Sequence, residues 1–325
     1  MIRYFAGRAV EIVVTLAAMS VIVYGLIGLM PGDPIDLMVA GDPRMTAEDA
    51  ARLRALYEVD KPLPQRYLAW ASQALQGNFG YARSLGQPVL SALGPRLLNT
   101  LQLAGIAFVL SISIALPLGI WAAARPRGRA DYLINLLCFA GISTPPFWLA
   151  LLLITLFAVT LGWLPAGGMA DIRPGTSTAS ALTEHLRHAA LPVLTLTLLQ
   201  LGGYTRFMRG AMIEALRQDY IRTARANGAP PARVLWGHAF GNALAPVLTV
   251  LALSFGHLLS GALITETVFA WPGMGRAIYQ GILDNDYNLA LVGLLIATLA
   301  TIAGNLLADL AYAWVDPRVS LTAHE

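Results

Sequence analysis

The chain is poor in cysteine, in lysine and in charge of either sign, and each shortage excludes a class of protein. A single cysteine, Cys138, rules out an internal disulfide. Lysine occurs once, at Lys61, and no G-x-x-x-x-G-K-[ST] loop is present, which excludes a phosphate-cradling loop of that kind. Charged residues make up 13 % of the chain, against about a quarter in soluble domains. The chain is therefore not expected to be an ordinary soluble domain, and nothing in it resembles a nucleic-acid site.

Residues that could support catalysis or bind a metal are also scarce. Glu184, His185 and His188 have helical spacing, which suits a metal pair or, without a further ligand at a matching spacing, the polar end of an interfacial helix. His257 lies inside an apolar run, where it is either a functional candidate or a neutral histidine hydrogen-bonded to a neighbouring helix. We therefore predict no catalytic site, no metal site and no cofactor in this chain.

What the chain has in abundance is long apolar runs. Hydrophobic residues make up 56 % of the sequence. About 20 apolar residues cross a bilayer as a helix, and a helix satisfies its own backbone hydrogen bonds there. We therefore predict an all-α, polytopic membrane protein with six transmembrane helices, the first of them retained rather than cleaved as a signal peptide. The runs are Ile12–Gly32, Leu97–Ala124, Tyr132–Ala170, Ala189–Thr205, Asn242–Thr265 and Tyr287–Ala308.

Basic residues indicate which ends of these runs face the cytoplasm. Arginine clusters at 125–129 and 206–209 flank the runs 132–170 and 189–205, and the positive-inside tendency places both clusters inside. An even number of crossings must then separate them. The run 132–170, interrupted by Ser-Thr-Pro-Pro at 143–146, is therefore predicted to cross once as a long or broken helix, not as a hairpin. Six crossings place both termini in the cytoplasm.

The remaining sequence divides the chain into four parts. Residues 33–96 are predicted to form a small helical periplasmic insertion, in which Thr46 to Asp49 has the pattern of a capped helix start. The parts are the first transmembrane helix (1–32), this insertion (33–96), the transmembrane core of helices 2–6 (97–312) and a cytoplasmic tail (313–325).

One basic segment, residues 206–241, interrupts the apolar sequence. It holds six arginines against two acids, Glu214 and Asp219. A helix-forming run from 211 to 227 is followed by Gly-Ala-Pro-Pro and a second run from 232 to 240, and glycine with proline close behind is a helix stop signal. Two short helices joined at a fixed angle would form a docking knob for a soluble partner; an ordinary amphipathic connector is the alternative.

Several motifs of the chain resemble those of one known family. The string at 219–228, DYIRTARANG, is similar to the peptide-subgroup form of the motif EAA-x3-G-x9-I-x-L-P, with Gly228 at the glycine. Further matches are PGDP at 31–34, NTL at 99–101, TETVFAWPGMG at 265–275 and DPR at 316–318. Over nearly its whole length the chain resembles the inner-membrane permease of a bacterial ATP-binding-cassette importer of the dipeptide, oligopeptide and nickel group. The long segment after the first run is typical of the first of its two permeases.

The resemblance implies the type I importer permease fold, a bacterial inner-membrane location and a set of partners. These are a second homologous permease, two ATPase subunits that hold the ATP and magnesium, a periplasmic solute-binding protein and the lipid bilayer. The basic segment would dock on an ATPase, so this chain would transmit force and gate a pathway without catalysing hydrolysis. Arginines 222 and 225 could pair with acidic groups of that partner or contact lipid headgroups. The predicted coupling residues are Glu214, Asp219, Tyr220, Arg222, Thr223, Ala224, Arg225, Gly228, Arg233 and His238.

Polar residues elsewhere suggest a gate or pathway. Small and polar side chains within apolar runs either let helices approach and hydrogen-bond or line a wet path. The candidates are Asn99, Thr100, Gln102, Ser254, His257, Thr265 and Glu266. The loop 269–275 suits a re-entrant outer gate that meets the binding protein through Trp271, Pro272, Gly273, Met274 and Gly275, or an interfacial aromatic anchor.

Two other functional classes are weaker fits. An ion-coupled secondary transporter would carry charges at the membrane midplane and often internal repeats, and neither is evident. An intramembrane enzyme would need a nucleophile and base or a metal set within the runs, and only His257 is a candidate. The cargo stays open, since peptides, nickel chelates and glutathione all use similar permeases.

Overall fold

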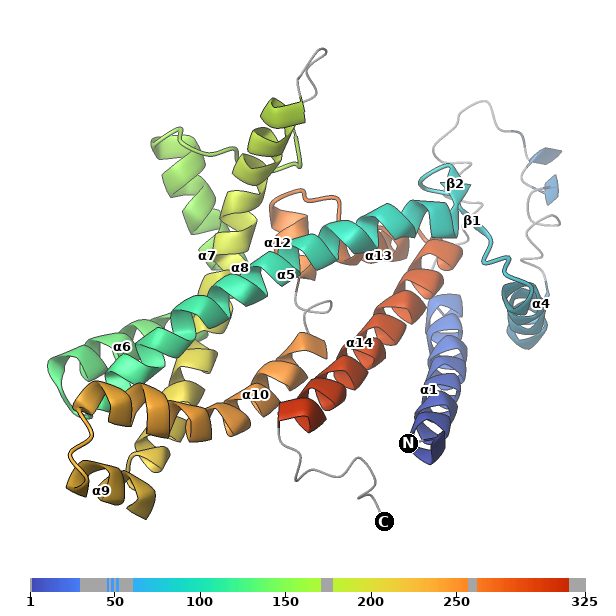
Figure 1. Cartoon of the computed structure of the whole chain (residues 1–325). Helices are drawn as coiled ribbons and strands as arrows, with labels where there is room; N and C mark the ends of the chain where they lie inside the picture. The colour runs from blue at the N-terminus through green and yellow to red at the C-terminus, as the bar shows by residue number, and fades with distance from the viewer. Residues whose placement is uncertain are drawn as a thin grey trace. The chain divides into compact units, whose positions relative to one another are not determined.

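The computed structural model describes residues 2–29, 46, 48–49, 51–52, 61–170, 178–256 and 262–315, and this part of the chain is almost entirely helical (Figure 1). It forms two compact units. The first lies within residues 1–100 and 272–300, and the second within residues 101–271 and 301–325. Two of the three boundaries fall inside long helices, α5 (Val89–Ala124) and α14 (Tyr287–Val315), and the third falls in the loop at 271–272.

The first unit combines long apolar helices with short polar connections. Its elements are α1 (Ile2–Gly28), α4 (Leu63–Leu75), β1 (Tyr81–Ala82), β2 (Gln87–Pro88), the start of α5, α13 (Met274–Leu283) and the start of α14. The two strands pair antiparallel, with Tyr81 opposite Pro88. Val89, Leu93, Met274 and Leu289 are buried together, so the end of the hairpin, α5, α13 and α14 share one core.

The second unit is assembled around one long helix, α8 (Thr178–Ala215). Its other elements are the rest of α5 and α14, α6 (Arg129–Ser143), α7 (Pro146–Leu153), the π-helical η1 (Ile154–Thr160), α9 (Asp219–Ala226), the π-helical η2 (Arg233–Ala239), α10 (Phe240–Gly256) and α12 (Leu263–Val268). Buried side chains of α5, α8, α9, η2 and α10 form its largest core.

Glycines let the helices of this unit approach α8 closely. A Cβ at Gly202 of α8 would stand 2.6 Å from the carbonyl oxygen of Cys138 in α6, and one at Gly119 of α5 would stand 2.8 Å from that of Thr205. Distances this short leave no room for a side chain. Small residues at helix contacts are typical of membrane proteins, in which packing rather than water exclusion holds the helices together.

The predicted apolar runs mostly coincide with long helices. Among the described residues, four helices are long and apolar enough to cross a bilayer: Ala6–Gly28, Val89–Ala124, Arg233–Ser254 and Tyr287–Leu307. The run 189–205 lies within α8, which is not among these four because polar residues such as Thr195 and Gln200 interrupt its apolar sequence.

The predicted break in the run 132–170 is confirmed. α6 ends at Ser143, α7 begins at Pro146, and the pair α6 and α7–η1 is bent by 105° between them. Pro145 and Pro146 cannot donate backbone hydrogen bonds to the preceding turn, which is why the helix stops there. Taken as one broken span, the pair is a fifth helical segment apolar enough to cross.

The structure also confirms the predicted helix cap at Thr46. Its Oγ1 accepts a hydrogen bond from the backbone N–H of Asp49 at 3.2 Å, and the Asp49 carboxylate accepts one from the backbone N–H of Thr46 at 3.0 Å. These reciprocal bonds form a capping box. The hydrogen bonds from Thr46 lower the pKa of the Asp49 carboxyl below its ordinary value.

Candidate coupling site

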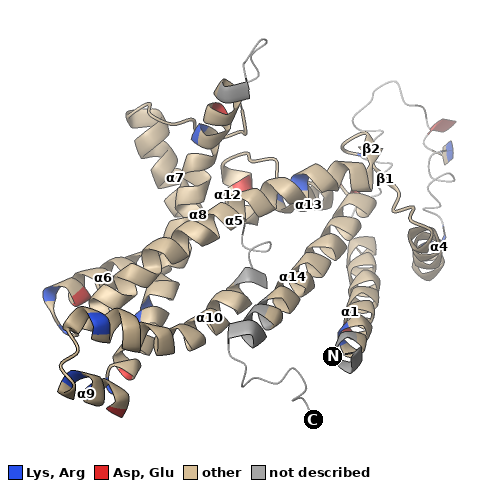
Figure 2. Cartoon of the chain, viewed as in Figure 1, with Lys and Arg blue, Asp and Glu red and all other residues tan. Residues whose placement is uncertain are grey.

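The basic segment forms the end of α8, the whole of α9 and η2, and the start of α10. Within the second unit, α9 lies beyond the neighbouring ends of α8 and α10 (Figure 1). Charged residues gather in this region, whereas the middle parts of the same helices are almost uncharged (Figure 2). The predicted knob is therefore a charged projection on an apolar helical body.

The first helix of the knob is not the single run predicted from 211 to 227. α8 ends at Ala215, three residues form a turn, and α9 begins at Asp219. The backbone N–H groups of Arg217 and Gln218 bond to the carbonyls of Glu214 and Ala215, which tightens the last turn and ends α8. An acid in the first turn of α9 is favoured by the helix dipole, so Asp219 starts a new helix more readily than it continues the old one.

Ile221 fixes α9 to the body of the unit. It is fully buried and belongs to the core formed with Met208 and Met212 of α8 and Val234 of η2. Burying an isoleucine side chain contributes about 1.5–3 kcal/mol. Ile221 is the only buried residue of this eight-residue helix. The other faces of α9 are therefore not packed into the core.

Gly228 ends α9 in a left-handed turn, as predicted. Its φ is +77°, its N–H donates to the carbonyl of Arg225 at 3.0 Å, and the N–H of Ala229 donates to that of Ala224 at 3.0 Å. These two bonds define a Schellman motif. A Cβ at Gly228 would meet nothing within 4 Å, so the backbone conformation, not lack of space, favours glycine here.

Most of the predicted coupling side chains are exposed around this anchored helix. Arg222 and Asp219 form an ion pair at 3.1 Å in which 79 % and 91 % of the two side chains are exposed. The structure also brings Tyr220, Thr223 and Arg225 to the surface of α9, while Ala224 is half-buried. The same projection exposes Glu214 and Arg233 and half-buries His238.

One exposed aromatic in the segment was not predicted. Trp236 of η2 is 52 % exposed, and its ring lies 5.8 Å from that of Phe240. A tryptophan in a basic segment that ends a membrane helix is the signal that could have found it, because this residue favours polar–apolar boundaries.

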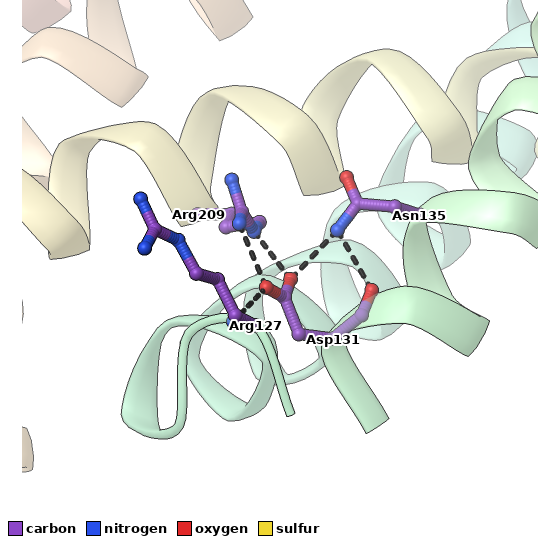
Figure 3. A network of polar contacts seen from close by, with 4 residues as sticks. All are labelled: Arg127, Asp131, Asn135 and Arg209. Atoms are coloured by element: carbon purple, nitrogen blue, oxygen red, sulfur yellow. Dashed lines mark hydrogen bonds and ion pairs between the residues drawn. The ribbon is translucent and has the colours of Figure 1, made fainter. Parts of the chain in front are cut away.

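The base of the knob is fixed by a buried ion pair that sequence reasoning missed (Figure 3). Arg209 of α8 donates from Nε and Nη2 to the two carboxylate oxygens of Asp131 in α6, at 2.5 and 2.8 Å. The backbone N–H of Arg127 and the side chain of Asn135 donate to the same carboxylate at 2.8 and 2.7 Å. The Asp131 side chain is 5 % exposed. A bidentate arginine pair with two further donors is a strong, directional contact.

This ion pair joins the ends of the two helices that carry the predicted cytoplasmic arginine clusters. Asp131 belongs to the first turn of α6, directly after the cluster 125–129, and Arg209 belongs to the cluster 206–209. The guanidinium of Arg206 also lies 4.7 Å from the ring centroid of Phe139 in α6. Two arginines of the segment thus contact α6, Arg206 from an exposed position and Arg209 from a half-buried one, whereas the exposed arginines at 217, 222, 225 and 233 belong to the projection.

The predicted pathway residues are divided between the two units, and each group is described within its own unit. In the first unit, Asn99 donates to the carbonyl of Pro272 at 2.9 Å, and Thr100 Oγ1 accepts from the N–H of Met274 at 2.8 Å. Thr100 thereby satisfies an N–H at the start of α13 that the helix itself leaves unpaired. These two residues hold a loop in this structure.

The pathway candidates of the second unit have different surroundings. Gln102 is exposed, and Ser254 donates to the carbonyl of Val250 at 2.8 Å within its own helix. Thr265 and Glu266 are buried in α12, and the Thr265 hydroxyl has no hydrogen-bond partner among the described residues. His257 lies outside the described residues.

The loop 269–275, predicted to be an outer gate, is largely buried in this structure. Trp271 is fully buried among Leu103, Ala107 and Val193, and Met274 is 1 % exposed. Gly273 is also buried, while Pro272 and Gly275 are half-buried. The buried side chains hold the loop in place, and the contact with a binding protein stays a prediction for all five residues.

The predicted histidine pair has ordinary packing partners. His188 Nδ1 lies 2.9 Å from the carbonyl oxygen of Gly167, and the His185 ring lies 5.4 Å from that of Trp271. Within the part of the chain that the structure describes, no group of three or more His, Cys, Asp or Glu residues is placed to hold a metal ion.

Known proteins similar to this chain are permeases. The family described as binding-protein-dependent transport system inner membrane component matches residues 115–321. The oligopeptide transport system permease protein AppB of Bacillus subtilis is 34 % identical, covering 98 % of this chain and 99 % of the relative. The di/tripeptide permease DppB of Pseudomonas aeruginosa is 36 % identical, and the dipeptide permease DppB of Escherichia coli 32 %, each covering 98 % of this chain and 99 % of the relative. The chain belongs to the family of binding-protein-dependent inner-membrane transport components, and it is a permease subunit of an ATP-driven importer.

Proposed function

We propose that this permease imports peptides or a closely related small solute delivered by a periplasmic binding protein. The observation that carries the proposal is full-length similarity to permeases named for oligopeptides, tripeptides and dipeptides. A second homologous permease would complete the pathway, and two ATPases would supply the energy. Nickel chelates or glutathione are alternative cargoes for the same machinery.

The basic segment is the proposed contact with one ATPase. α9 is well suited to this role because Ile221 fixes it to the helical body while Arg222 and Arg225 remain exposed. The turn at Gly228 sets the angle between α9 and the chain that leads into η2 and α10. Movement of the ATPase would reach α8 and α10 from the two ends of α9.

The proposed topology has six crossings, both termini in the cytoplasm and residues 33–96 on the periplasmic side. The contact between Asp131 and Arg209 supports it, since one face of the membrane must hold both the start of α6 and the end of α8. That requirement is met if the bent pair α6 and α7–η1 crosses once and α8 crosses once in return.

Cysteine labelling tests this topology. In a Cys138→Ala chain within the assembled importer, Arg127→Cys and Gln218→Cys should react with a membrane-impermeant thiol reagent only from the cytoplasmic side. Gln76→Cys and Thr178→Cys should react only from the periplasmic side. Reaction of the first two positions from opposite sides would mean that 132–170 crosses as a hairpin.

Two measurements test the function. The purified chain should hydrolyse no ATP, whereas its complex with the ATPases should, and contaminant-free hydrolysis by the chain alone would contradict the non-catalytic role. Mass spectrometry of ligands retained by the cognate binding protein should find short peptides. Recovery of a nickel chelate or glutathione in their place would replace the proposed cargo and leave the permease role intact.

A further inference from the structure

The helix α4 carries two adjacent apolar stripes and one polar stripe. Residues four and three apart share one face of a helix. The stripe Leu63, Tyr67, Trp70 and Ala74 is half-buried against the unit. The stripe beside it, Pro64, Leu68, Ala71 and Leu75, is more exposed: Ala71 is half-buried, but Leu68 is 66 % exposed and Leu75 91 %. The remaining face carries Gln65, Arg66, Ala69, Ser72 and Gln73.

Contacts with α1 fix the level of α4 in the membrane. The Tyr67 hydroxyl lies 2.9 Å from Ser20 Oγ, and the Leu63 side chain fills the space where a Cβ at Gly28 would stand. Between Ala6 and Gly28, α1 is long and apolar enough to cross the membrane. At 1.5 Å per residue, Ser20 is about 12 Å inside the end of that span. The buried stripe of α4 therefore lies alongside the last turns of a membrane helix and not beyond them.

Aromatic and basic side chains around α4 are those expected at a membrane boundary. The rings of Tyr24, Tyr67 and Trp70 form one cluster, with centroids 5.5–6.2 Å apart. The Arg66 guanidinium lies 5.8 Å from the ring of Tyr287, the residue at which the span of α14 begins. Tyrosine and tryptophan gather at the interface between hydrocarbon and headgroups, and arginine extends from there toward water.

The exposed stripe of α4 lies at the same level as exposed apolar side chains of α1. Val21, Ile22 and Leu26 are each more than half exposed on the same turns of α1 that α4 contacts. An amphipathic helix with an apolar flank at that level is suited to the plane of the interface. We propose that α4 is an in-plane membrane helix whose stripe Pro64, Leu68, Ala71 and Leu75 is buried in the acyl chains of the bilayer. This places α4, which belongs to the predicted insertion 33–96, in the membrane interface.

Spin-label accessibility tests the proposal in the complete importer. Labels are attached to single cysteines in a Cys138→Ala chain, assembled with its partners in vesicles of phosphatidylethanolamine and phosphatidylglycerol. Oxygen, which concentrates in lipid, and a water-soluble nickel chelate report the surroundings of each label. Labels at Leu68 and Leu75 should favour oxygen as strongly as a label at Leu26 of α1. Labels at Gln65 and Gln73, on the same helix, should favour the nickel chelate.

Two outcomes would overturn the proposal. Nickel accessibility at Leu68 and Leu75 equal to that at Gln65 and Gln73 would place the whole helix in water. Low accessibility to both reagents at Leu68 and Leu75 would mean that a protein surface, such as the second permease, covers the stripe. Lipid contact by α4 does not depend on which face of the bilayer it occupies or on the solute transported, so either outcome leaves the permease role unaffected.

Discussion

The contact between α6 and α8 and the projection formed by α9 lie at the same end of the second unit but are built in opposite ways. Between α6 and α8, backbone packs on backbone at Gly202, and the charges of Asp131 and Arg209 satisfy each other away from water. On α9, one isoleucine is buried and the charges of Asp219 and Arg222 are exposed. Both regions contain an Asp–Arg pair, but only one pair is positioned to stabilise the fold.

This difference separates the arginines of the basic segment into two groups. Arg206 and Arg209 contact α6 within the chain, so they hold helices together. The arginines at 222 and 225 are exposed on the helix that α8 and η2 support, so they are available to another protein. Substitutions should accordingly lower stability in the first group and weaken coupling in the second.

The largest effect is expected from Asp131→Ala. The substitution removes an acceptor that serves Arg209, Asn135 and the N–H of Arg127, and it leaves a half-buried guanidinium unpaired. Breaking a buried ion pair costs about 3 kcal/mol. Thermal unfolding of the purified chain in detergent should show this loss. Arg222→Ala, which breaks the exposed pair and keeps the acid in the first turn of α9, is the control and should leave the melting temperature unchanged. Equal shifts in the two variants would contradict the distinction between the regions.

A smaller loss of stability is expected from Gly202→Ala. The added Cβ would stand 2.6 Å from the Cys138 carbonyl oxygen, so α6 and α8 must separate. Overpacking of this kind costs about 2 kcal/mol. Gly203→Ala is the matched control: a Cβ there meets nothing within 4 Å, and alanine is the better helix former. Equal melting temperatures for the two variants would disprove the close contact between α6 and α8.

On the projection, Gly228→Pro should impair coupling and leave insertion intact. Proline holds φ near −65° and has no N–H, so it can adopt neither the +77° turn nor the bond to the carbonyl of Arg225. Ligand-stimulated ATP hydrolysis and transport by the reconstituted importer should fall severely. The control is Gly210→Ala in α8, where an added Cβ meets nothing within 4 Å. This variant should keep both ligand-stimulated ATP hydrolysis and transport. Wild-type transport by Gly228→Pro at wild-type abundance would remove the turn from the coupling mechanism.

The smallest effect is expected from Arg222→Glu. The side chain is 79 % exposed, so the fold should tolerate the change, while the reversed charge should weaken ATPase retention on pull-down by about 1 kcal/mol. The weakening should be greater at low salt, where repulsion is unscreened. Arg187→Glu, at the opposite end of α8, should retain the ATPase normally. If neither salt nor substitution altered retention, α9 would not be the docking helix.

Local chemistry made several of these features predictable. Two adjacent prolines predicted the break after Ser143, a glycine followed by two prolines predicted the turn at Gly228, and the spacing of Thr46 and Asp49 predicted a capping box. In each case the residues that decide the backbone conformation are neighbours in sequence. The apolar runs predicted the membrane class for a similar reason, because bilayer thickness sets their length.

Features that depend on distant contacts were not predictable. Residues 211–227 are good helix formers throughout, and besides the local effect of Asp219, the end of α8 at Ala215 is favoured by a distant contact, because the turn there lets Ile221 reach the core. Asp131 and Arg209 are far apart in sequence, so their ion pair could not be predicted from neighbouring residues. The signal that the sequence offered for it was a lone acid at the start of an apolar run. The burial of Trp271 depends on its packing against α5 and α8.

The glycine contact between α6 and α8 also determines how displacement passes through the membrane part of the unit. Side chains that interdigitate can change rotamer and let two helices slide, but a carbonyl resting on a glycine offers no such adjustment. With Asp131 and Arg209 joining one end, α6 and α8 have to travel as a single rigid body. A disulfide engineered across this contact should therefore leave the transport cycle running, because it would join two helices that never need to part.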